Sequence, residues 1–436
     1  MTCIATGVGI RDRWSGLAPP WMTAHPSSVQ AQTAGASVWR TNFCGSIPDN
    51  VVRTTKLQSL THDARRRLAA VSLLLLACSA PDALMAQEPR PITLRDAPCE
   101  GCRIHVEPVI RLGSVDGAEA FHGNAVMELW SEGLAVHDAY AVGVIRQFDL
   151  EGNLVAAFGQ AGEGPGEHRI VRHIRVGRGD TLSVYDSGRD VVNRFDPRGK
   201  FVDQIWVPPT VFDFVPIGGD RLLVSGIVQT RHAAGFPLHV VRDGTIERSF
   251  GNDGTYMPAS FDRRLVRSLG QSTQGSIWAA HQMQYTLERW DTAGSLKQVF
   301  TRDVPWFGPW DGIETPPNAR PPAPLIRGVH EDVDGLLWVF IGVADLNWRP
   351  VPFQRSPTGA LMPAARAEYD DLYDLIIEVI DPRRGEVIAH TRGTRDFKAM
   401  RGGLLFSYED EPSGVPYYRI WQPRLIRQPP GGPSDA

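Results

Sequence analysis

The sequence predicts an all-β fold: a six-bladed β-propeller with four-stranded antiparallel blades, closed by an N-terminal strand. Six segments of the chain share one pattern of short strands, at the spacing that is typical of propeller blades. The 436 residues include 43 Gly and 34 Pro, a composition that favours many turns over long helices. A spare strand precedes the first complete repeat, and the last repeat offers it a partner. We therefore predict one propeller over residues 104–428.

Each repeat contains an apolar run that follows a turn-forming Gly or Asp. These runs start at Leu134, Leu182, Leu222, Ile277, Leu337 and Leu405, so the intervals are 48, 40, 55, 60 and 68 residues. In the first two repeats the run leads to Ile145–Asp149 and Asn193–Asp196, and each time a Gly and a second apolar strand follow. Two alternating strands around an Asp/Gly turn predict a hairpin. The longer intervals predict larger insertions in the later blades.

A propeller needs a closed ring, because an open array would leave strand edges exposed to aggregation. Residues Ile104–Leu112 form a strand-like segment ahead of the first complete blade, and Tyr417–Trp421 supply a late strand in the sixth repeat. We predict that the N-terminal strand completes the last blade.

The connection between the first two repeats, Phe158–His168, reads F-G-Q-A-G-E-G-P-G-E-H. It resembles the F-G-x-x-G-x-G-P-G-x-F turn of the NHL-repeat family of six-bladed propellers, which includes bacterial exported proteins, with His168 in place of the usual Phe. The resemblance covers residues 104–428 by pattern. It implies that ligands bind at one end of the central channel, at the loops that lead into the innermost strands.

The segment from Arg65 to Gln87 has a basic start, a short apolar run and a small-residue end, which is the pattern of a secretory signal and too short to span a membrane. We expect a miscalled or disordered leader over residues 1–64, a signal peptide over 65–86, an N-terminal segment over 87–103 and a disordered tail over 429–436. Two processing sites compete. Leu75–Cys78 resembles a lipobox that would leave Cys78 lipidated, and Leu84–Ala86 resembles an ordinary signal-peptidase site. Both predict the periplasm or cell envelope, and the first an outer-membrane lipoprotein.

Charge argues against nucleic acid as a partner. Residues 1–86 hold eight Lys/Arg and four Asp, so the remainder has 37 basic and 45 acidic residues and a net charge of -8. A diffuse nucleic-acid surface would need the opposite balance. Contact with a membrane is expected only through a lipid anchor.

Two cysteines, Cys99 and Cys102, remain in the expected mature chain. In an oxidising compartment a C-x-x-C beside a strand can close as a local disulfide, which is the preferred interpretation. A thioredoxin-like redox site would need a helix N-terminus, whereas Pro98 and Gly101 favour a turn. A zinc half-site would need a second ligand pair, and none is evident.

Four arginines recur at one repeat position, ten residues before the apolar run of their blade: Arg172, Arg267, Arg327 and Arg395. Phe212 occupies this position in the third blade. Because the resemblance places it at the channel mouth, these guanidiniums would form a site for carboxylate or phosphate. The alternative is that they are separate surface residues or partners of blade aspartates.

Two insertions should emerge over the same face. One runs from Asp303 to Pro324 and contains Trp306 and Trp310, and the other spans residues 344–373 and contains Trp348. Stiff aromatic loops over a channel would form a lid to which Trp306 and Trp310 contribute ligand contacts. The alternative is that these tryptophans pack the insertions onto the propeller.

No metal site or cofactor is predicted. Relatives of this type include calcium-dependent lactonases and a zinc-dependent lyase, but only Asp213 and Asp396 share a repeat position as carboxylates. His173 and His330 fall two positions apart in the repeat, and the repeat alignment does not fix the position of His122. We expect a non-catalytic propeller that binds an anionic small molecule, glycan or protein segment. The alternatives are a calcium- or zinc-dependent hydrolase or lyase, and an assembly scaffold without a small-molecule site.

Overall fold

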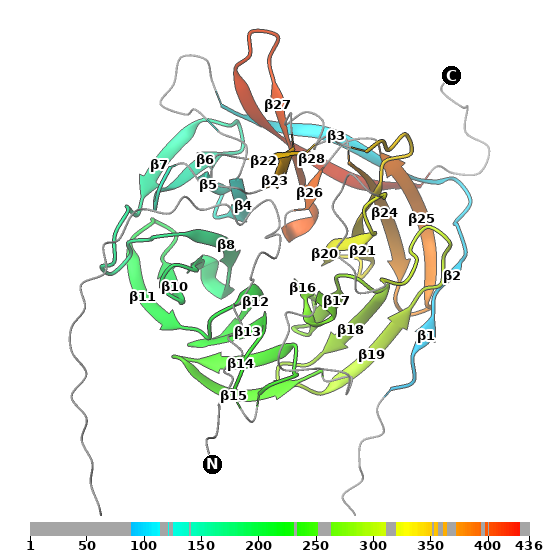
Figure 1. The fold of residues 1–436 in the computed structure, drawn as a ribbon, viewed down its shortest axis with the longest axis horizontal. Helices are drawn as coiled ribbons and strands as arrows, with labels where there is room; N and C mark the ends of the chain where they lie inside the picture. Colours follow the sequence, from blue (N-terminus) through cyan, green and yellow to red (C-terminus); the bar gives the residue numbers. More distant parts are fainter. Residues whose placement is uncertain are drawn as a thin grey trace, which may run out of the picture. The chain divides into compact units, whose positions relative to one another are not determined.

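A computed structural model describes residues 89–113, 121, 125–138, 141–230, 233–251, 263–310, 320–350, 353–355, 361–363, 372–393, 397–399 and 401–427. Six antiparallel sheets surround a central axis, which confirms the predicted six-bladed propeller (Figure 1). Blade 1 comprises β4 (Ala125–Trp130), β5 (Gly133–Asp138), β6 (Ile145–Asp149) and β7 (Leu154–Phe158); blade 2 comprises β8 (Val171–Val176), β9 (Leu182–Asp186), β10 (Val191–Phe195) and β11 (Phe201–Trp206); blade 3 comprises β12 (Val211–Gly218), β13 (Arg221–Gly226), β14 (Leu238–Arg242) and β15 (Thr245–Phe250).

The second half of the ring continues the pattern. Blade 4 comprises β16 (Arg267–Gln271), β17 (Ile277–His281), β18 (Thr286–Trp290) and β19 (Leu296–Thr301); blade 5 comprises β20 (Leu325–Glu331), β21 (Leu337–Ala344), β24 (Tyr373–Asp381) and β25 (Glu386–Gly393); blade 6 comprises β26 (Lys398–Ala399), β27 (Leu405–Asp410), β28 (Pro416–Arg427) and β3 (Cys102–Leu112). Short 3-10 turns lie at Arg178–Asp180 (η2), Arg263–Leu265 (η3) and Arg401–Gly403 (η4).

The apolar core is divided among the contacts between blades. Six clusters of buried side chains lie between successive blades, one for each contact around the ring, including that between blades 6 and 1. The apolar runs of the repeat form the second strands, and β5, β9 and β17 are buried along their whole length. Each blade therefore needs a neighbour on both faces, which is the physical reason for ring closure.

The predicted closure is confirmed. Strand β3 pairs antiparallel with β28, from Leu112 opposite Tyr418 to Cys102 opposite Arg427. The backbone N–H of Ala125 in blade 1 also donates to the hydroxyl of Tyr418 in blade 6, at 3.0 Å. Strands β3 and β28, from the two ends of the propeller sequence, thus lie in one sheet. A hydrogen bond joins this sheet to blade 1.

The residues ahead of β3 also belong to the ring. Strand β1 (Ile92–Thr93) pairs parallel with β19, and β2 (Arg95–Asp96) pairs parallel with β25, so residues 92–96 add a fifth strand to blades 4 and 5. We call residues 92–96 the rim strap. Its Leu94 is 4% exposed and enters the core between these two blades.

Every outermost strand carries one extra residue at the same place. The register against the third strand shifts by one residue in all six blades, and the extra residues are Val109, Val155, Val202, Glu247, Lys297 and Ile388. A bulge bends a strand and interrupts its pairing pattern, which disfavours long additional pairing at an outer edge; the strands added to blades 4 and 5 are only two residues long. The sixfold repetition shows that the pseudo-symmetry extends to single residues.

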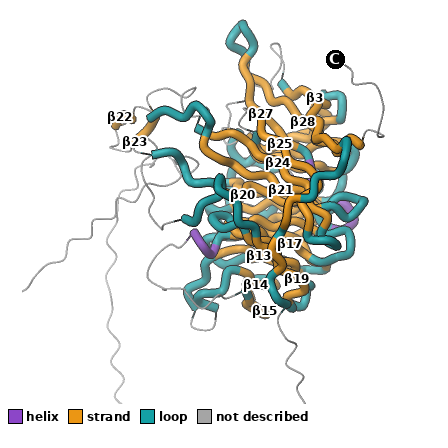
Figure 2. Tube along the Cα trace, turned by 90° about the vertical axis from the view of Figure 1, so that its right-hand side faces the viewer, coloured by secondary structure: helices purple, strands orange, loops and turns teal. Residues whose placement is uncertain are grey.

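The connection between β21 and β24 contains a separate hairpin, β22 (Phe353–Arg355) with β23 (Leu361–Pro363). Figure 2 shows it standing apart from the stacked blades on one side of the ring. This is the side on which the innermost strands begin, and we call it the mouth face. Within the described ranges, no helix has the length and apolar character needed to cross a membrane.

Candidate ligand site at the channel mouth

Three of the four predicted arginines lie near the start of an innermost strand, at the end nearest the mouth face. Arg172 is the second residue of β8, Arg267 the first of β16 and Arg327 the third of β20. Phe212 is the second residue of β12, and Arg395 lies outside the described residues. Strands β8 and β20 face each other across the central axis (Figure 1), so Arg172 and Arg327 come from opposite sides of the ring.

Three of these positions are β-bulges. The register shifts at Arg172 in β8, at Phe212 in β12 and at Arg327 in β20, whereas Arg267 pairs in regular register with His281. A bulge redirects the side chain of the extra residue away from the regular alternation of its strand. The innermost strands of blades 2, 3 and 5 therefore share one local backbone distortion, and in two of them the residue so redirected is an arginine.

Arg172 has a partly buried guanidinium. Its Nε donates to the Ser187 hydroxyl at 3.4 Å, and burial lowers its pKa below the ordinary value for arginine. The neighbouring His173 ring stacks on Tyr185 with 6.2 Å between centroids. Partial desolvation strengthens the interaction of a cation with any anion that reaches it.

Arg327 lies over an aromatic ring. Its Cζ is 4.9 Å from the centroid of Tyr373, and its Nη1 donates to the carbonyl of Phe397 at 2.9 Å. A Cβ at Gly342 would come within 2.5 Å of the Arg327 Nε, so a larger residue there would displace this side chain. The glycine and the ring together fix the direction of the guanidinium.

Arg267 is placed differently. Its side chain is 1% exposed, and its Nε lies 3.9 Å from a carboxylate oxygen of Glu288. Glu288 also contacts His281 at 2.8 Å; burial raises the pKa of Glu288, but His281 and Arg267 together bring it below the usual value. Arg267 thus belongs to a buried ionic network in blade 4, whereas Arg172 and Arg327 are both partly exposed.

Asp213, the carboxylate considered for calcium, is held within the protein. It accepts hydrogen bonds from Arg175 Nη2 at 2.5 Å and from the backbone amides of Phe214 and Leu269, both at 2.8 Å. Arg175 also lies 3.8 Å from the Glu128 carboxylate. A polar chain therefore crosses the innermost strands of blades 1 to 4. Sequence reasoning missed Glu128 and Arg175. Each pairs with the second residue of its apolar run, Ala135 or Ser183, but the turns between the strands differ in length, so the two charges do not share one sequence spacing.

Trp306 packs onto the propeller. Its ring lies 6.3 Å from Tyr285, 6.2 Å from Phe307 and 5.9 Å from His390, measured between centroids. It rests on the core between blades 4 and 5, which is the packing role that the sequence left open. Trp310 is partly buried at the last described residue before the loop, and Trp348 lies in the second insertion.

A fully buried carboxylate, Glu378, contacts Tyr285 and His390, two of the residues whose rings lie beside Trp306. It accepts hydrogen bonds from the Tyr285 hydroxyl at 2.5 Å and from Arg302 Nη2 at 2.9 Å, and it contacts His390 Nδ1 at 3.1 Å. Burial raises the pKa of Tyr285 well above its ordinary value, and Glu378 raises it further. Arg302 also binds Asp96 at 2.8 Å, so the cluster ties the rim strap to blades 4 and 5. These residues are distant in sequence, and no local spacing could have indicated their meeting.

Metal ligands do not gather in the part of the chain that the structure describes: no three His, Cys, Asp or Glu side chains there are arranged to hold a metal ion. His173 lies in blade 2 and His330 in blade 5, where a Cβ at Gly403 would approach its ring. His122 and Asp396 fall outside the described residues.

Comparison with known proteins supports the fold. No protein-family model and no curated protein matches this sequence. A Bacteroides fragilis protein whose name describes it as exported has a TM-score of 0.50 at 10% identity. The match covers 77% of this chain and 100% of that protein. A member of the DUF4221 family from Bacteroides vulgatus has a TM-score of 0.51 at 9% identity, covering 75% and 99%. A virginiamycin B lyase from Staphylococcus aureus with quinupristin has a TM-score of 0.40 at 10% identity, covering 73% and 99%. At such identities the likeness to the two Bacteroides proteins shows the fold alone.

Proposed function

We propose that this chain is a non-catalytic binding propeller of the cell envelope, which takes an anionic ligand at the channel mouth between Arg172 and Arg327. The observation that carries the proposal is the pair of arginines at bulged positions on opposite sides of the ring. Each planar guanidinium offers two parallel donors to a carboxylate or phosphate. A ligand that reaches both would carry two anionic groups or one extended anionic chain, as in an acidic glycan, a small polyanion or an acidic protein segment.

Export is part of the proposal. It is supported by the signal-like segment from Arg65 to Gln87 and by the disulfide between Cys99 and Cys102, since structural disulfides belong to oxidising compartments. The NHL-type resemblance is supported by the packing of His168, which is buried, lies 5.7 Å from the Phe195 ring and bonds the Gly143 carbonyl at 2.8 Å. The imidazole thus fills the apolar place that the motif assigns to Phe.

The proposal is tested by titration calorimetry of the oxidised protein with trigalacturonate, tripolyphosphate and neutral maltotriose. We expect saturable binding of at least one anion and none of maltotriose. Arg172→Ala and Arg327→Ala should each weaken binding by about 1–3 kcal/mol, because each removes a charge-assisted contact. Arg198→Ala serves as the matched control, since Arg198 is an exposed arginine on a turn at the opposite face. Equal binding by wild type and both mouth variants would contradict the site, and stoichiometric calcium or zinc in the purified protein would favour a metal-dependent enzyme.

A further inference from the structure

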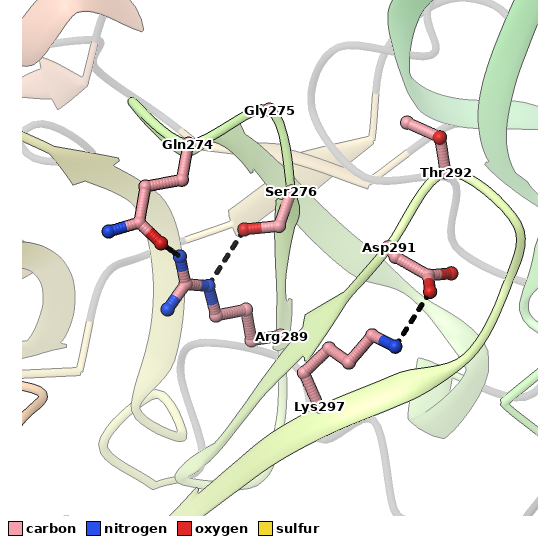
Figure 3. A pocket seen from close by; sticks show the side chains of 7 residues that line it. All are labelled: Gln274, Gly275, Ser276, Arg289, Asp291, Thr292 and Lys297. Atoms are coloured by element: carbon pink, nitrogen blue, oxygen red, sulfur yellow. Dashed lines mark hydrogen bonds and ion pairs between the residues drawn. The ribbon is translucent and has the colours of Figure 1, made fainter.

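A polar depression lies on the face opposite the mouth, in blade 4. It measures about 310 Å³ and is formed by the β16–β17 turn, the β18–β19 turn and the strands that flank the second turn (Figure 3). Its side chains are Gln274, Ser276, Arg289, Asp291, Thr292 and Lys297. Two cations, two hydroxyls and an amide thus meet in a space of the size that holds small ligands.

Arg289 is oriented by neutral groups. Its Nε donates to Ser276 Oγ at 2.7 Å, and its Nη2 donates to Gln274 Oε1 at 2.9 Å and to Ser272 Oγ at 3.3 Å. The guanidinium also lies 5.6 Å from the Trp278 ring. Among the residues that the structure describes, no carboxylate bonds this guanidinium. Hydroxyl and amide acceptors fix its direction while leaving its charge uncompensated at contact distance.

In blade 2 the arginine at the position of Arg289 forms an ion pair with a carboxylate. Arg194 occupies the equivalent place in β10, faces Asp203 across the strand pair and is bonded by both carboxylate oxygens. In blade 4 the residue opposite Arg289 is Gln298, whose amide donates instead to the Pro382 carbonyl at 2.9 Å. A neutral residue therefore replaces the cross-strand carboxylate in the blade that has the depression.

Two further cations border the same space. Lys297 is the bulge residue of β19 and lies 2.8 Å from Asp291, which is the one acidic residue that lines the depression. A Cβ at Gly275 would lie 4.0 Å from Nη2 of Arg178, so a third cation approaches from blade 2. The Glu331 carboxylate nearby is occupied by Trp278, Thr273 and Ser272.

We propose that this depression is a second ligand site, which binds a small polyhydroxylated anion such as a sugar that bears a carboxylate or a phosphate. Arg289 and Lys297 bind the anionic group, and Gln274, Ser276 and Thr292 meet the hydroxyls. The site goes beyond the mouth site, because it uses other residues on the other face of the ring.

The experiment is titration calorimetry of the oxidised protein in phosphate-free buffer with glucuronate, glucose 6-phosphate and glucose. We expect one or both anions to bind at least tenfold more tightly than glucose, and the tighter one identifies the anionic group. Lys297→Met should weaken that binding about tenfold, as should Arg289→Gln. Lys200→Met is the matched control, an exposed lysine on the equivalent turn of blade 2, and should leave binding unchanged. Lys297 is half-exposed, so its variant should fold normally even if the Arg289 variant does not.

Equal affinity for glucose and the anions, no saturable binding, or unchanged binding by Lys297→Met would each overturn the proposal. The two sites are separated by repeating the titration with the Arg172→Ala/Arg327→Ala double variant, in which glucuronate binding should persist. Loss of binding there, with retention in Lys297→Met, would assign the ligand to the mouth and remove the second site while leaving the first.

Discussion

Arg175 in blade 2 donates a hydrogen bond to Asp213 in blade 3, with 2.5 Å between Nη2 and Oδ1. Both side chains are largely buried, at 15% and 11% exposure. Asp213 continues the contact to the backbone of Leu269 in blade 4. One ion pair therefore joins three successive innermost strands around the central axis, just below the bulges that carry Arg172 and Phe212.

Removing one partner of this pair should destabilise the ring strongly. We expect Asp213→Ala to lower the free energy of unfolding by about 3–5 kcal/mol, because Arg175 would stay buried without its closest carboxylate. Asp220→Ala, which breaks a half-exposed pair with Arg242, should cost less than about 1 kcal/mol. Urea denaturation of the two variants measures both. A loss from Asp213→Ala no larger than that from the control would show that the pair does not hold the blades together.

The disulfide between Cys99 and Cys102 should stabilise the strands at the outer rim of the propeller. It connects the segment that follows the rim strap to the first residue of β3, and the backbone amide of Cys99 also donates to the carbonyl of Ile388 in blade 5 at 3.0 Å. Its loop is short, so chain entropy predicts a loss of only about 2 kcal/mol in the Cys99→Ser/Cys102→Ser variant. Relative to wild type, this variant should show a larger increase in the rate of amide hydrogen exchange in β1, β2 and β3 than in β9 or β13. Free thiols in the oxidised wild-type protein would refute this account.

His239 should make stability depend on pH. It is buried and contacts the Ser249 hydroxyl at 2.8 Å, and burial lowers its pKa to about 4. In the unfolded chain His239 takes up a proton near its ordinary pKa of 6.5, whereas in the folded protein it stays neutral down to about pH 4. The contribution of the neutral, buried His239 to the free energy of unfolding is fully present above pH 6.5. It is lost as the pH falls from 6.5 to 4, and the loss is roughly 3 kcal/mol.

Unfolding measured between pH 7 and pH 4 tests this. His239→Gln should lose less stability over that interval than wild type, and His105→Gln, a change at an exposed histidine, should follow wild type. Parallel pH profiles for wild type and His239→Gln would contradict the assignment.

The mature protein should lack residues 1–86 or begin at a lipidated Cys78. Intact-mass analysis after expression with the native leader in a bacterial host should find Gln87 or the lipidated cysteine at the N-terminus. A soluble chain that retains Met1 would overturn both the export proposal and the argument for an oxidising compartment.

The repeat predicted the ring because its signals are local. A turn residue, an apolar run and a second strand recur within each blade, and the runs at Leu134 and Leu182 lie in β5 and β9 as expected. The strand at Ile104–Leu112 was found because closure needs a partner for β28. The rim strap was not found, because two-residue strands such as Ile92–Thr93 have no periodicity.

The sites were harder to predict, because side-chain partners depend on contacts across strands and blades. Equal spacing placed Arg172 and Arg327 at the same bulged position of β8 and β20. Arg267 instead pairs in regular register with His281, where blades 2 and 5 have Val171 and Ile326, and spacing could not show that Glu288 lies beside it. The sequence does contain a signal for the depression at Arg289. The repeat arginine faces Asp203 in blade 2 and Gln298 in blade 4, and a comparison of the outer strands would have shown the exchange.

The location of a bound anion tests the central claim most directly. A crystal of the oxidised protein grown with selenate should give an anomalous selenium peak within hydrogen-bonding distance of Arg172 or Arg327 on the mouth face. The peak should be lost in the Arg172→Ala/Arg327→Ala variant under the same conditions. Selenate bound elsewhere on the ring, with no peak at either arginine of the wild-type protein, would contradict an anion site at the channel mouth.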